Sequence, residues 1–464
     1  MKAQCAFLIA ICLTAIGAAQ AQTTTSWGWN SPYDTDWFNP ANWSNGVPDK
    51  NTKAVLYDSS SPYPLITTGH AEALLLHIGS DGPRVTIDGG ELSAEQVDMG
   101  ETSGIVLLSG TCSVTQLRFR SGFLDVRGGY FGLGVGGYAT MDSFVWQSGG
   151  QVVLNGTLWI TDESFTDPGY NLLGGSLIAQ TIHIGKGPNY PGGSGGGALK
   201  LHGGQAIIKE LTVGLPDNVA PGLTSGKLFI TSTAQVTIES RLAFEHMSRL
   251  EATPGSMIRM AASGTAAASF DNKLTDASRL ADLANLTLSF QGGAAGDFEV
   301  AGRDVGATLA GWDNNFVLGA LELGGTAAGG MHLVDNHDNQ AGNEALYVLG
   351  LQIGSGGKAQ LGGLNLYYLN GGDPKQLFMG DANLDGLVNL LDLAGLAASY
   401  SKSGTWAQGD FDGDGVINVL DLASLASNYG RVPTQTVPEP ATCVLLCLGA
   451  LMVIGRRVGP SARR

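Results

Sequence analysis

The sequence predicts a mainly β protein in which a parallel β-helix forms the body, a small α-helical module follows, and an apolar helix ends the chain. Two observations predict the body. Glycine supplies 69 of the 464 residues while only 14% are charged, which is typical of many tight turns between short apolar strands. The central part of the chain also repeats itself about every 20 residues. The helical module is predicted separately, by a duplicated twelve-residue loop near residue 400.

The repeat is clearest in three segments that align without gaps, Thr86–Gly100, Asn171–Gly185 and Lys200–Gly214. Each contains a Gly-Gly pair, a short strand, an alternating strand and a closing glycine. Weaker copies between them have a Gly-Gly or Ser-Gly turn in the same place. The turns begin at residues 89, 109, 128, 149, 174 and 203, so they are 20, 19, 21, 25 and 29 residues apart.

A period near 20 with two or three short strands suits one turn of a parallel β-helix. Each turn stacks on the next and buries alternate side chains in a shared core. The longer intervals leave room for inserts such as the glycine-rich loop at 192–197. An antiparallel sandwich is the alternative, because its strands also recur about every 8 to 12 residues.

The strength of the repeat divides the chain into regions. We expect β-helix repeats over 81–240 and a further β-rich region over 241–372, where the repeat weakens. Residues 22–80 come first and contain several tryptophans, including Trp29 and Trp37. Because a solenoid needs its open ends covered, we expect an aromatic cap and the first strands there. A surface that stacks on sugars is the alternative.

The two twelve-residue loops begin at Asp381 and Asp410, 29 residues apart and in the same register. Oxygen-bearing side chains stand at loop positions 1, 3, 5, 9 and 12, position 7 offers its backbone carbonyl, and position 6 is glycine. Ca²⁺ prefers about six to eight hard oxygen ligands on a loop that turns tightly at position 6. The sequence therefore predicts two calcium ions, and plain solvated turns are the alternative. The expected ligands are Asp381, Asn383, Asp385, Leu387, Asn389 and Asp392 in the first loop, and Asp410, Asp412, Asp414, Val416, Asn418 and Asp421 in the second.

Nearly the same segment follows each loop, at 391–400 and 420–429, with leucine, alanine and a final tyrosine at helical spacing. Each unit is thus a loop that leads into a short helix. In this, residues 380–430 resemble a type I dockerin; Asp at position 12 distinguishes them from a standard EF-hand. The resemblance implies a calcium-folded module, within 373–430, that docks onto a cohesin-like protein.

In dockerins the partner is commonly contacted through loop positions 10 and 11, often hydroxyl residues. Here those positions are apolar: Leu390, Leu391, Val419 and Leu420. The second loop has four carboxylates and the first has three, so we expect the second to bind Ca²⁺ more tightly. Because these carboxylates repel one another and so short a segment has little core, we expect the module to fold only with Ca²⁺.

The start of the chain is typical of a secretory signal peptide. Lys2 precedes an apolar stretch from Cys5 to Ala19, and a small-x-small cleavage site ends at Ala21. The predicted signal peptide is therefore 1–21, and we expect an exported mature chain.

The other end follows a linker at 431–437 and has three parts in order: a Pro-Glu-Pro motif at 438–440, an apolar run at 441–455 and a pair of arginines. As a helix the apolar run spans about 22 Å, against about 30 Å for a bilayer core. The arginines favour a cytoplasmic end. This trio resembles the PEP-CTERM sorting tail of Gram-negative bacteria, and a plain anchor helix is the alternative. The resemblance implies that 438–464 is a membrane-spanning tail until an exosortase, a sorting protease, acts near the motif. We then expect the protein at the cell surface or in the extracellular matrix.

The charge balance and the cysteines narrow the function further. With 25 basic and 41 acidic residues, the net charge of −16 argues against nucleic-acid binding. Of five cysteines, Cys112 alone lies outside the signal peptide and the tail, so no internal disulfide can form in the mature body. We expect it to be a small core residue.

Pectate lyases and polygalacturonases are β-helix proteins, so catalysis has to be considered. The candidate residues are Asp88, Asp98, Asp125, Asp142, Asp162, Glu163, His183 and His202. In the alignment Asp98 falls in one column with His183 and Thr212, and Asp88 falls in another with Leu173 and His202, so the candidates do not stack on adjacent turns and no catalytic residue is predicted. A polar loop is also the preferred interpretation of Asp335–Asp338, over a metal cluster. We expect a structural or adhesive protein that docks through its calcium module. The alternative is an enzyme or accessory protein of polysaccharide breakdown, with polysaccharide as its partner.

Overall fold

The computed structural model describes residues 23–28, 34–57, 61–119, 122–141, 144–160, 169–185, 196–214, 226–262 and 265–432. The predicted signal peptide, most of the linker, the sorting tail, Trp29 and most of the glycine-rich insert lie outside these residues. Within them, no helix is both long and apolar enough to span a bilayer.

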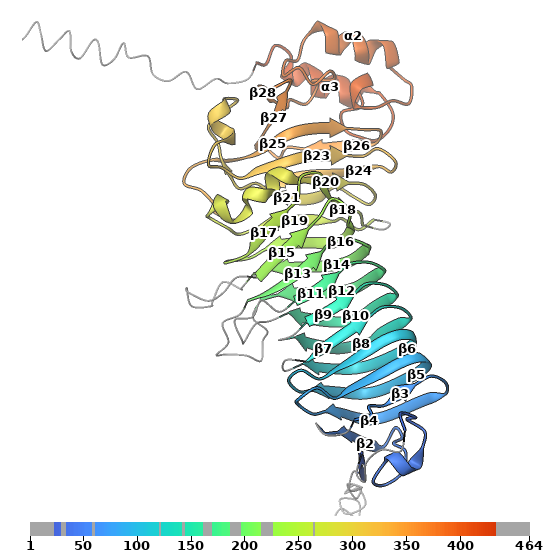
Figure 1. Cartoon of the computed structure of the whole chain (residues 1–464). Coiled ribbons are helices and arrows are strands. Elements are labelled where there is room, and N and C mark those ends of the chain that lie inside the picture. The colour runs from blue at the N-terminus through green and yellow to red at the C-terminus, as the bar shows by residue number, and fades with distance from the viewer. Residues whose placement is uncertain are drawn as a thin grey trace, which may run out of the picture.

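The described chain is mainly β, and its strands stack into one long ladder (Figure 1). The first series of strands is β1 (Thr23–Trp27), β2 (Thr52–Leu56), β4 (His70–Ile78), β5 (Arg84–Met99), β6 (Gly104–Phe119), β8 (Tyr130–Met141), β10 (Gln151–Ile160), β12 (Ser176–Ile184), β14 (Gln205–Val213), β16 (Gln235–Phe244), β18 (Ser256–Met260), β20 (Leu286–Phe290), β23 (Val317–Leu323), β25 (Glu344–Ile353) and β27 (Asn365–Asn370). Each member pairs in parallel with the next.

A second series covers the other side. It contains β3 (Leu65–Ile66), β7 (Phe123–Val126), β9 (Phe144–Gln147), β11 (Gly169–Leu172), β13 (Gly197–Leu201), β15 (Gly226–Ile230) and β17 (Arg249–Ala252). Four later strands, β19 (Ser269–Asn272), β21 (Gly296–Glu299), β24 (Gly329–Val334) and β26 (Gly357–Gln360), instead continue from the second half of β16, with which β19 pairs. The first halves of β5 and β6 join β3 to β7. We call one passage of the chain through both series a rung. Among the strand pairs of the described residues, only those of β22 (Gly302–Arg303) with β25 and of β28 (Asp373–Gln376) with β27 are antiparallel. The antiparallel sandwich is therefore excluded, and the ladder is compatible with a β-helix.

The sequence repeat predicts the register of these rungs. Asn171 pairs with Lys200, as the alignment of their segments requires. Thr86 reaches Asn171 through three intermediate rungs, at Val106, Asp125 and Trp146. The predicted columns are therefore confirmed by the strand pairing.

Glycines at the corners let successive rungs approach closely. Gly129 has a φ of +71°, in the left-handed region that favours glycine. A Cβ atom on it would lie 2.4 Å from the carbonyl oxygen of Gly110, in the preceding rung. The same arrangement recurs at Gly150 and Gly175, whose added Cβ atoms would meet the backbone of the rung before. The Gly-Gly turns of the repeat are thus a column of backbone contacts.

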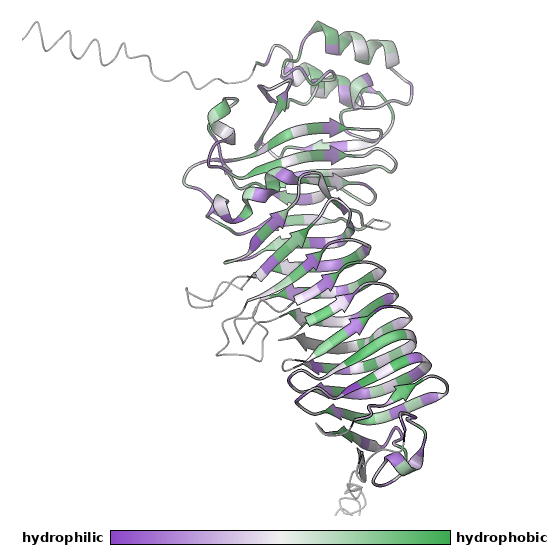
Figure 2. Ribbon diagram, in the orientation of Figure 1, coloured by the Kyte–Doolittle hydropathy of each residue, from purple (hydrophilic) through white to green (hydrophobic). Residues whose placement is uncertain are grey.

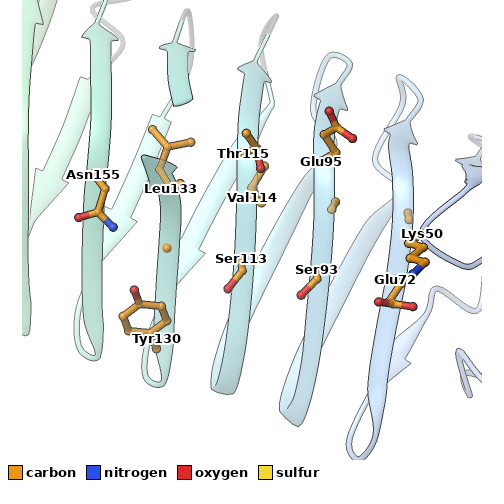
Figure 3. Close-up of a pocket in the computed structure, with 14 residues that line it drawn as sticks. Lys50, Glu72, Ser93, Glu95, Ser113, Val114, Thr115, Tyr130, Leu133 and Asn155 are labelled. Atoms are coloured by element: carbon orange, nitrogen blue, oxygen red, sulfur yellow. The ribbon is translucent and has the colours of Figure 1, made fainter. Parts of the chain in front are cut away.

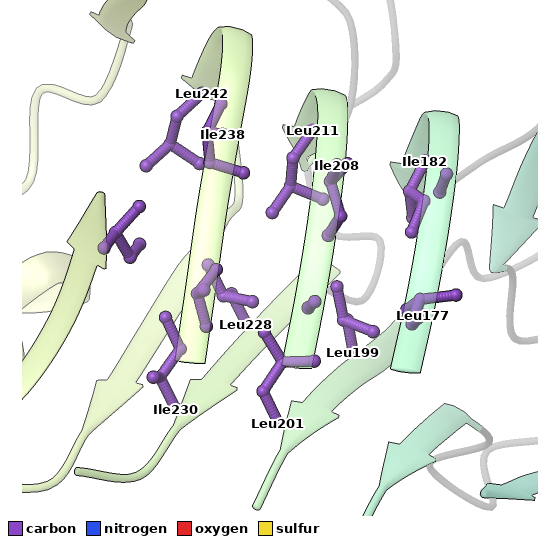
Figure 4. Packing of buried hydrophobic residues seen from close by; sticks show 14 of the residues in the cluster. Leu177, Ile182, Leu199, Leu201, Ile208, Leu211, Leu228, Ile230, Ile238 and Leu242 are labelled. Atoms are coloured by element: carbon purple, nitrogen blue, oxygen red, sulfur yellow. The ribbon is translucent and has the colours of Figure 1, made fainter. Parts of the chain in front are cut away.

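Alternate side chains of both series point inward and form one continuous apolar core. Figure 2 shows the resulting alternation of hydrophobic and hydrophilic residues along the strands. In Figure 4, Leu199 and Leu228 of the second series face Ile208 and Ile238 of the first. Full burial of one such aliphatic side chain contributes about 1.5 to 3 kcal/mol. Cys112 is also fully buried, as predicted, and burial raises the pKa of its thiol to about 12.

Tryptophans cover the N-terminal end of the core. Trp27, Trp37 and Trp43 are each at most 5% exposed, and both Trp27 and Trp37 pack edge-on against Trp43. The indole nitrogen of Trp43 donates to the carbonyl of Trp37 at 2.8 Å. Their rings are therefore buried against one another and offer no open face to a sugar.

The ladder continues beyond residue 240, where the sequence repeat weakens. Strand β16 runs across that point, and parallel pairing extends to β27. Three 3₁₀ segments lie between strands of the body: Pro40–Asn42, Ala277–Asn285 and Leu309–Trp312. The weakening repeat is thus not a boundary in the sheet, although beyond β16 its two halves continue as separate strands, β18 and β19, and the segment Ala277–Asn285 packs next to β17.

Two helices close the C-terminal end, α2 (Leu390–Ser399) and α3 (Val419–Asn428), with the 3₁₀ segment Trp406–Gln408 between them (Figure 1). Buried side chains of this module belong to the same apolar cluster as the β body. They are Val388, Leu396, Trp406, Phe411, Ile417 and Leu425.

Candidate calcium site

The last residue of each twelve-residue loop ties the loop to its helix. Asn389 and Asp392 form a capping box at the start of α2, and Asn418 and Asp421 form the same box at the start of α3. The predicted ligands at positions 9 and 12 therefore also satisfy the free backbone donors of the helix. The helices start where they do because of these residues.

The same aspartates reach back to the start of the loop. Asp392 Oδ1 accepts a hydrogen bond from the backbone N–H of Ala382 at 2.9 Å. Asp421 Oδ1 accepts the corresponding bond from Phe411 at 2.8 Å. Both aspartates are at most 1% exposed. Each loop is therefore closed into a ring by its twelfth residue.

The first residue of each loop is buried as well. Asp381 is fully buried, and its Oδ2 accepts from the backbone N–H of Gly386 at 2.8 Å. Burial, together with the nearby Asp385 and Asp392, raises the pKa of Asp381 to about 7. Burial also raises the pKa of Asp410. An ionised carboxylate in such a position is stabilised by a bound cation.

The second loop brings three carboxylates together. One oxygen each of Asp410, Asp412 and Asp414 lie within 4.8 Å of one another. Two oxygens that bind the same Ca²⁺ at about 2.3 to 2.6 Å can be at most about 5 Å apart. Asp410 Oδ1 is buried and has no hydrogen-bond partner in the part of the chain that the structure describes. This unpartnered oxygen and the close carboxylates fit a calcium ion.

The first loop carries an amide where the second has a carboxylate. Asn383 Oδ1 accepts from the backbone N–H of Asp385 at 3.0 Å, and its Nδ2 donates to Asp385 Oδ2 at 3.0 Å. The side chains of Leu387 and Val416, at position 7, point away and are 39% and 45% exposed. Only their backbone carbonyls are thus candidate ligands. A loop that holds Ca²⁺ would use Asp381, Asp385 and Asp392 as its charged ligands.

Four apolar side chains beside the loops are exposed. Leu390 and Leu391 are each 67% exposed, and Val419 and Leu420 are each 60% exposed. They occupy the first turn of α2 and of α3. The two exposed pairs occupy equivalent places in the two loop–helix units. We call these four residues the apolar pairs.

The catalytic candidates of the body do not converge. Strand pairing confirms that Asp98 and His183 share a column. Arg118, Thr140 and Trp159 occupy the three rungs between them, so the two residues are four rung steps apart. At about 4.8 Å for each rung, the two side chains are about 19 Å apart. That is too far for a shared proton or a shared substrate bond. Asp142, Asp162 and Glu163 lie outside the described residues.

The Asp335–Asp338 loop belongs to a polar network with β19 and β21, in which one ligand atom each of Asp271, Glu299 and His337 lie within 4.8 Å of one another. His337 Nε2 lies 3.0 Å from Asp271 Oδ1, and Glu299 accepts the backbone N–H groups of Asn336 and His337 at 2.8 and 2.7 Å. Arg241 pairs with Asp271. The network joins residues up to 66 positions apart, which no local motif could reveal. Its acids are already paired with cationic or N–H donors, so it serves to hold the 335–340 loop on the sheet.

No family model, curated protein or solved structure matches this chain.

Proposed function

We propose that the protein is an exported surface or matrix scaffold, a β-helix that ends in a calcium-dependent docking module. The observation that carries the proposal is the second loop, where three carboxylates converge beside the unpartnered Asp410 Oδ1. The apolar pairs support docking. The apolar segments and cleavage motifs at the chain ends support export and sorting.

Calcium would supply charge neutralisation to the loops. The residues of the chain do the rest: Asp392 and Asp421 link each loop to its helix, and the helices present the apolar pairs. A loop that loses its cation keeps several buried or adjacent carboxylates that repel one another. The orientation of the apolar pairs then depends on the metal.

Calorimetric titration of the full-length chain tests the metal site. We expect two bound Ca²⁺, with the tighter site lost in Asp410→Asn and the weaker one lost in Asp381→Asn. Glu101→Gln is the matched control: Glu101 is exposed, lies outside the two loops, and its side chain has no partner among the described residues. Absence of calcium heat in the unaltered chain would refute the proposal.

Docking is tested by binding of the calcium-loaded chain to purified cohesin-type domains. We expect binding that disappears in chelator and falls at least tenfold in the double variant Leu391→Lys, Leu420→Lys. Val432→Lys is the control, because Val432 is 62% exposed but lies beyond α3. Binding that survives chelator, or that the double variant leaves unchanged, would show that the apolar pairs are not the docking surface.

A further inference from the structure

A groove of about 460 Å³ crosses the outer surface of the N-terminal rungs (Figure 3). It runs over five neighbouring strands of the first series, from β4 to β10, where each strand bends between its two halves. Hydroxyl, carboxyl and amide side chains line it. The polar lining residues are Lys50, Glu72, Ser93, Glu95, Ser113, Thr115, Tyr130 and Asn155.

Strand register places these side chains at regular intervals. Glu72, Ser93 and Ser113 pair in sequence across β4, β5 and β6, and the next member of the column is Gly132. Neighbouring strands are about 4.8 Å apart, so the column offers one polar group for each such step. A Cβ atom on Gly132 would lie 2.8 Å from the ring of Tyr130, so that ring lies across the glycine and forms part of the groove floor.

The outward column of side chains is polar inside the groove and apolar just beyond it. Beyond Gly132 the same outward column continues as Val153, Ile178 and Ile207, all apolar, before it reaches Thr237. The polar residues at the start of this column therefore lie only in the rungs that the groove crosses. This is not the pattern of a uniformly solvated strand face.

Four of these polar side chains have no partner among the described residues, whereas Ser93 Oγ lies 2.9 Å from His70 Nε2. Within the described part of the chain, the side chains of Glu72, Ser113, Tyr130 and Asn155 make no hydrogen bond or ion pair. They supply donors and acceptors from four different strands and face the same space (Figure 3). Convergent polar groups without an internal partner are a feature of ligand sites.

The lining selects among ligand classes. Strand β5 is paired on both sides, by β4 and β6, so a peptide finds no open edge to extend the sheet. Glu72 and Glu95 repel polyanions, in line with the net charge of −16. Polyhydroxylated chains fit hydroxyl and amide partners, and an aromatic ring such as Tyr130 offers a flat face for a sugar.

We infer that this groove binds a linear glycan that is neutral or bears amino groups, laid along the rung direction from Glu72 to Asn155. The site is independent of the calcium module, which lies at the opposite end of the molecule (Figure 1). Glycan binding therefore persists in chelator under conditions where the β body remains folded. A chain that binds Ca²⁺ but no glycan would refute this inference alone.

Binding of three defined hexasaccharides to the full-length chain provides the test: β-linked glucose, β-linked glucosamine and galacturonate. We expect the first or second to bind and galacturonate to bind at least tenfold more weakly. Ser113→Trp fills the groove and should lower affinity at least tenfold. Thr237→Trp is matched to it, since it places the same bulk in the same column outside the groove.

Equal affinity of the two tryptophan variants would overturn the inference, as would preference for galacturonate, no binding by any sugar, or binding of extended peptides in place of sugars. Thermal melting of each variant shows whether it is folded. Asn155→Ala is a second variant that introduces no bulk, and it should lower affinity about threefold to tenfold through the loss of hydrogen bonds. An unchanged affinity in Asn155→Ala would also count against the site.

Discussion

At the residue scale, one buried polar pair interrupts the apolar core. Gln147 occupies an inward column between Val126 and Leu172 and is fully buried. Tyr170, on the next rung, donates its hydroxyl to Gln147 Oε1, and Gln147 Nε2 donates to the carbonyl of Ser176 at 2.9 Å. Burial raises the pKa of Tyr170 well above its ordinary value, so its hydroxyl stays protonated and donates.

Replacing one member of this pair should cost more than replacing both. Gln147→Leu leaves the Tyr170 hydroxyl buried without a partner, and we expect it to lower the free energy of unfolding by about 1 to 3 kcal/mol. The double variant Gln147→Leu, Tyr170→Phe should recover most of that loss. Denaturant unfolding of the four proteins in this cycle measures the difference. Additive losses would contradict the hydrogen bond.

The Glu299 carboxyl is a second residue whose surroundings affect stability. It is 2% exposed, and burial raises its pKa from 4.5 to about 7 against the opposing effect of the backbone hydrogen bonds from His337 and Asn336. The folded state then holds a proton that the unfolded state releases at lower pH. Stability should therefore be greatest below pH 4.5, fall as the pH rises to about 7, and change little from this group above that.

Glu299→Gln removes the titrating proton but keeps one acceptor oxygen. We expect the variant to flatten the fall in unfolding free energy between pH 4.5 and 7 by on the order of 1 to 3 kcal/mol. Denaturant unfolding in saturating Ca²⁺ at several pH values is the measurement, with Glu101→Gln as control. A variant whose pH profile parallels that of the unaltered chain would refute the assignment.

At the element scale, the corner glycines combine backbone conformation with close packing. Gly129 and Gly136 have almost the same φ, +71° and +72°. A Cβ atom on Gly129 would lie 2.4 Å from a backbone oxygen, whereas one on Gly136 would meet nothing within 4 Å. The two positions therefore separate the cost of the left-handed conformation from that of a clash between rungs.

Gly136→Ala should lower the free energy of unfolding by about 1 to 2 kcal/mol, because alanine is strained in the left-handed conformation. Gly129→Ala adds the clash and should cost about 2 to 5 kcal/mol in all. Thermal or denaturant unfolding compares the two. Equal losses would show that the rungs can separate enough to admit a methyl group at the corner.

At the scale of the whole molecule, the calcium module covers the C-terminal end of the β body. Leu377 and Phe378 are buried between the last strands and the module, and the hydroxyl of Tyr368 on β27 donates to Asp381 Oδ2 at 3.3 Å. Asn370 Nδ2 also donates to the carbonyl of Leu384 at 2.9 Å. Because one apolar cluster runs through both parts, the module and the last rungs should lose stability together.

Removal of Ca²⁺ should therefore weaken the β body as well as the module. Ca²⁺ at 100 times its dissociation constant would stabilise the folded state by about 2.7 kcal/mol for each site. We expect chelator to increase hydrogen exchange in β25 and β27 while β5 and β6 remain protected. The double variant Asp381→Asn, Asp410→Asn should remove the response. If chelator left hydrogen exchange in β25 and β27 unchanged, the stability of the β body would not depend on the module.

Much of this architecture could be predicted from local pattern. The gapless alignment of Asn171 with Lys200 was enough to obtain the register, because a stacked fold repeats its sequence wherever it repeats its backbone. The two acidic loops and the helices that follow them were equally predictable, because each unit lies within a short continuous segment. By contrast, residues 241–372 could not be resolved as further rungs, because inserts such as Ala277–Asn285 conceal the period.

The sequence by itself predicted the parallel rungs, the glycine corners and the buried Cys112, and it placed the proposed calcium ligands, since each depends on neighbours close in the chain or on the repeat. Only the tertiary structure decided that Asp98 and His183 are too far apart to cooperate, that His337 lies beside Asp271, and that unused polar groups converge in a groove. The physical reason is that strand spacing and rung number set these distances. The repeat suggests the rung number, but the parallel stacking that turns it into a distance is seen only in the structure.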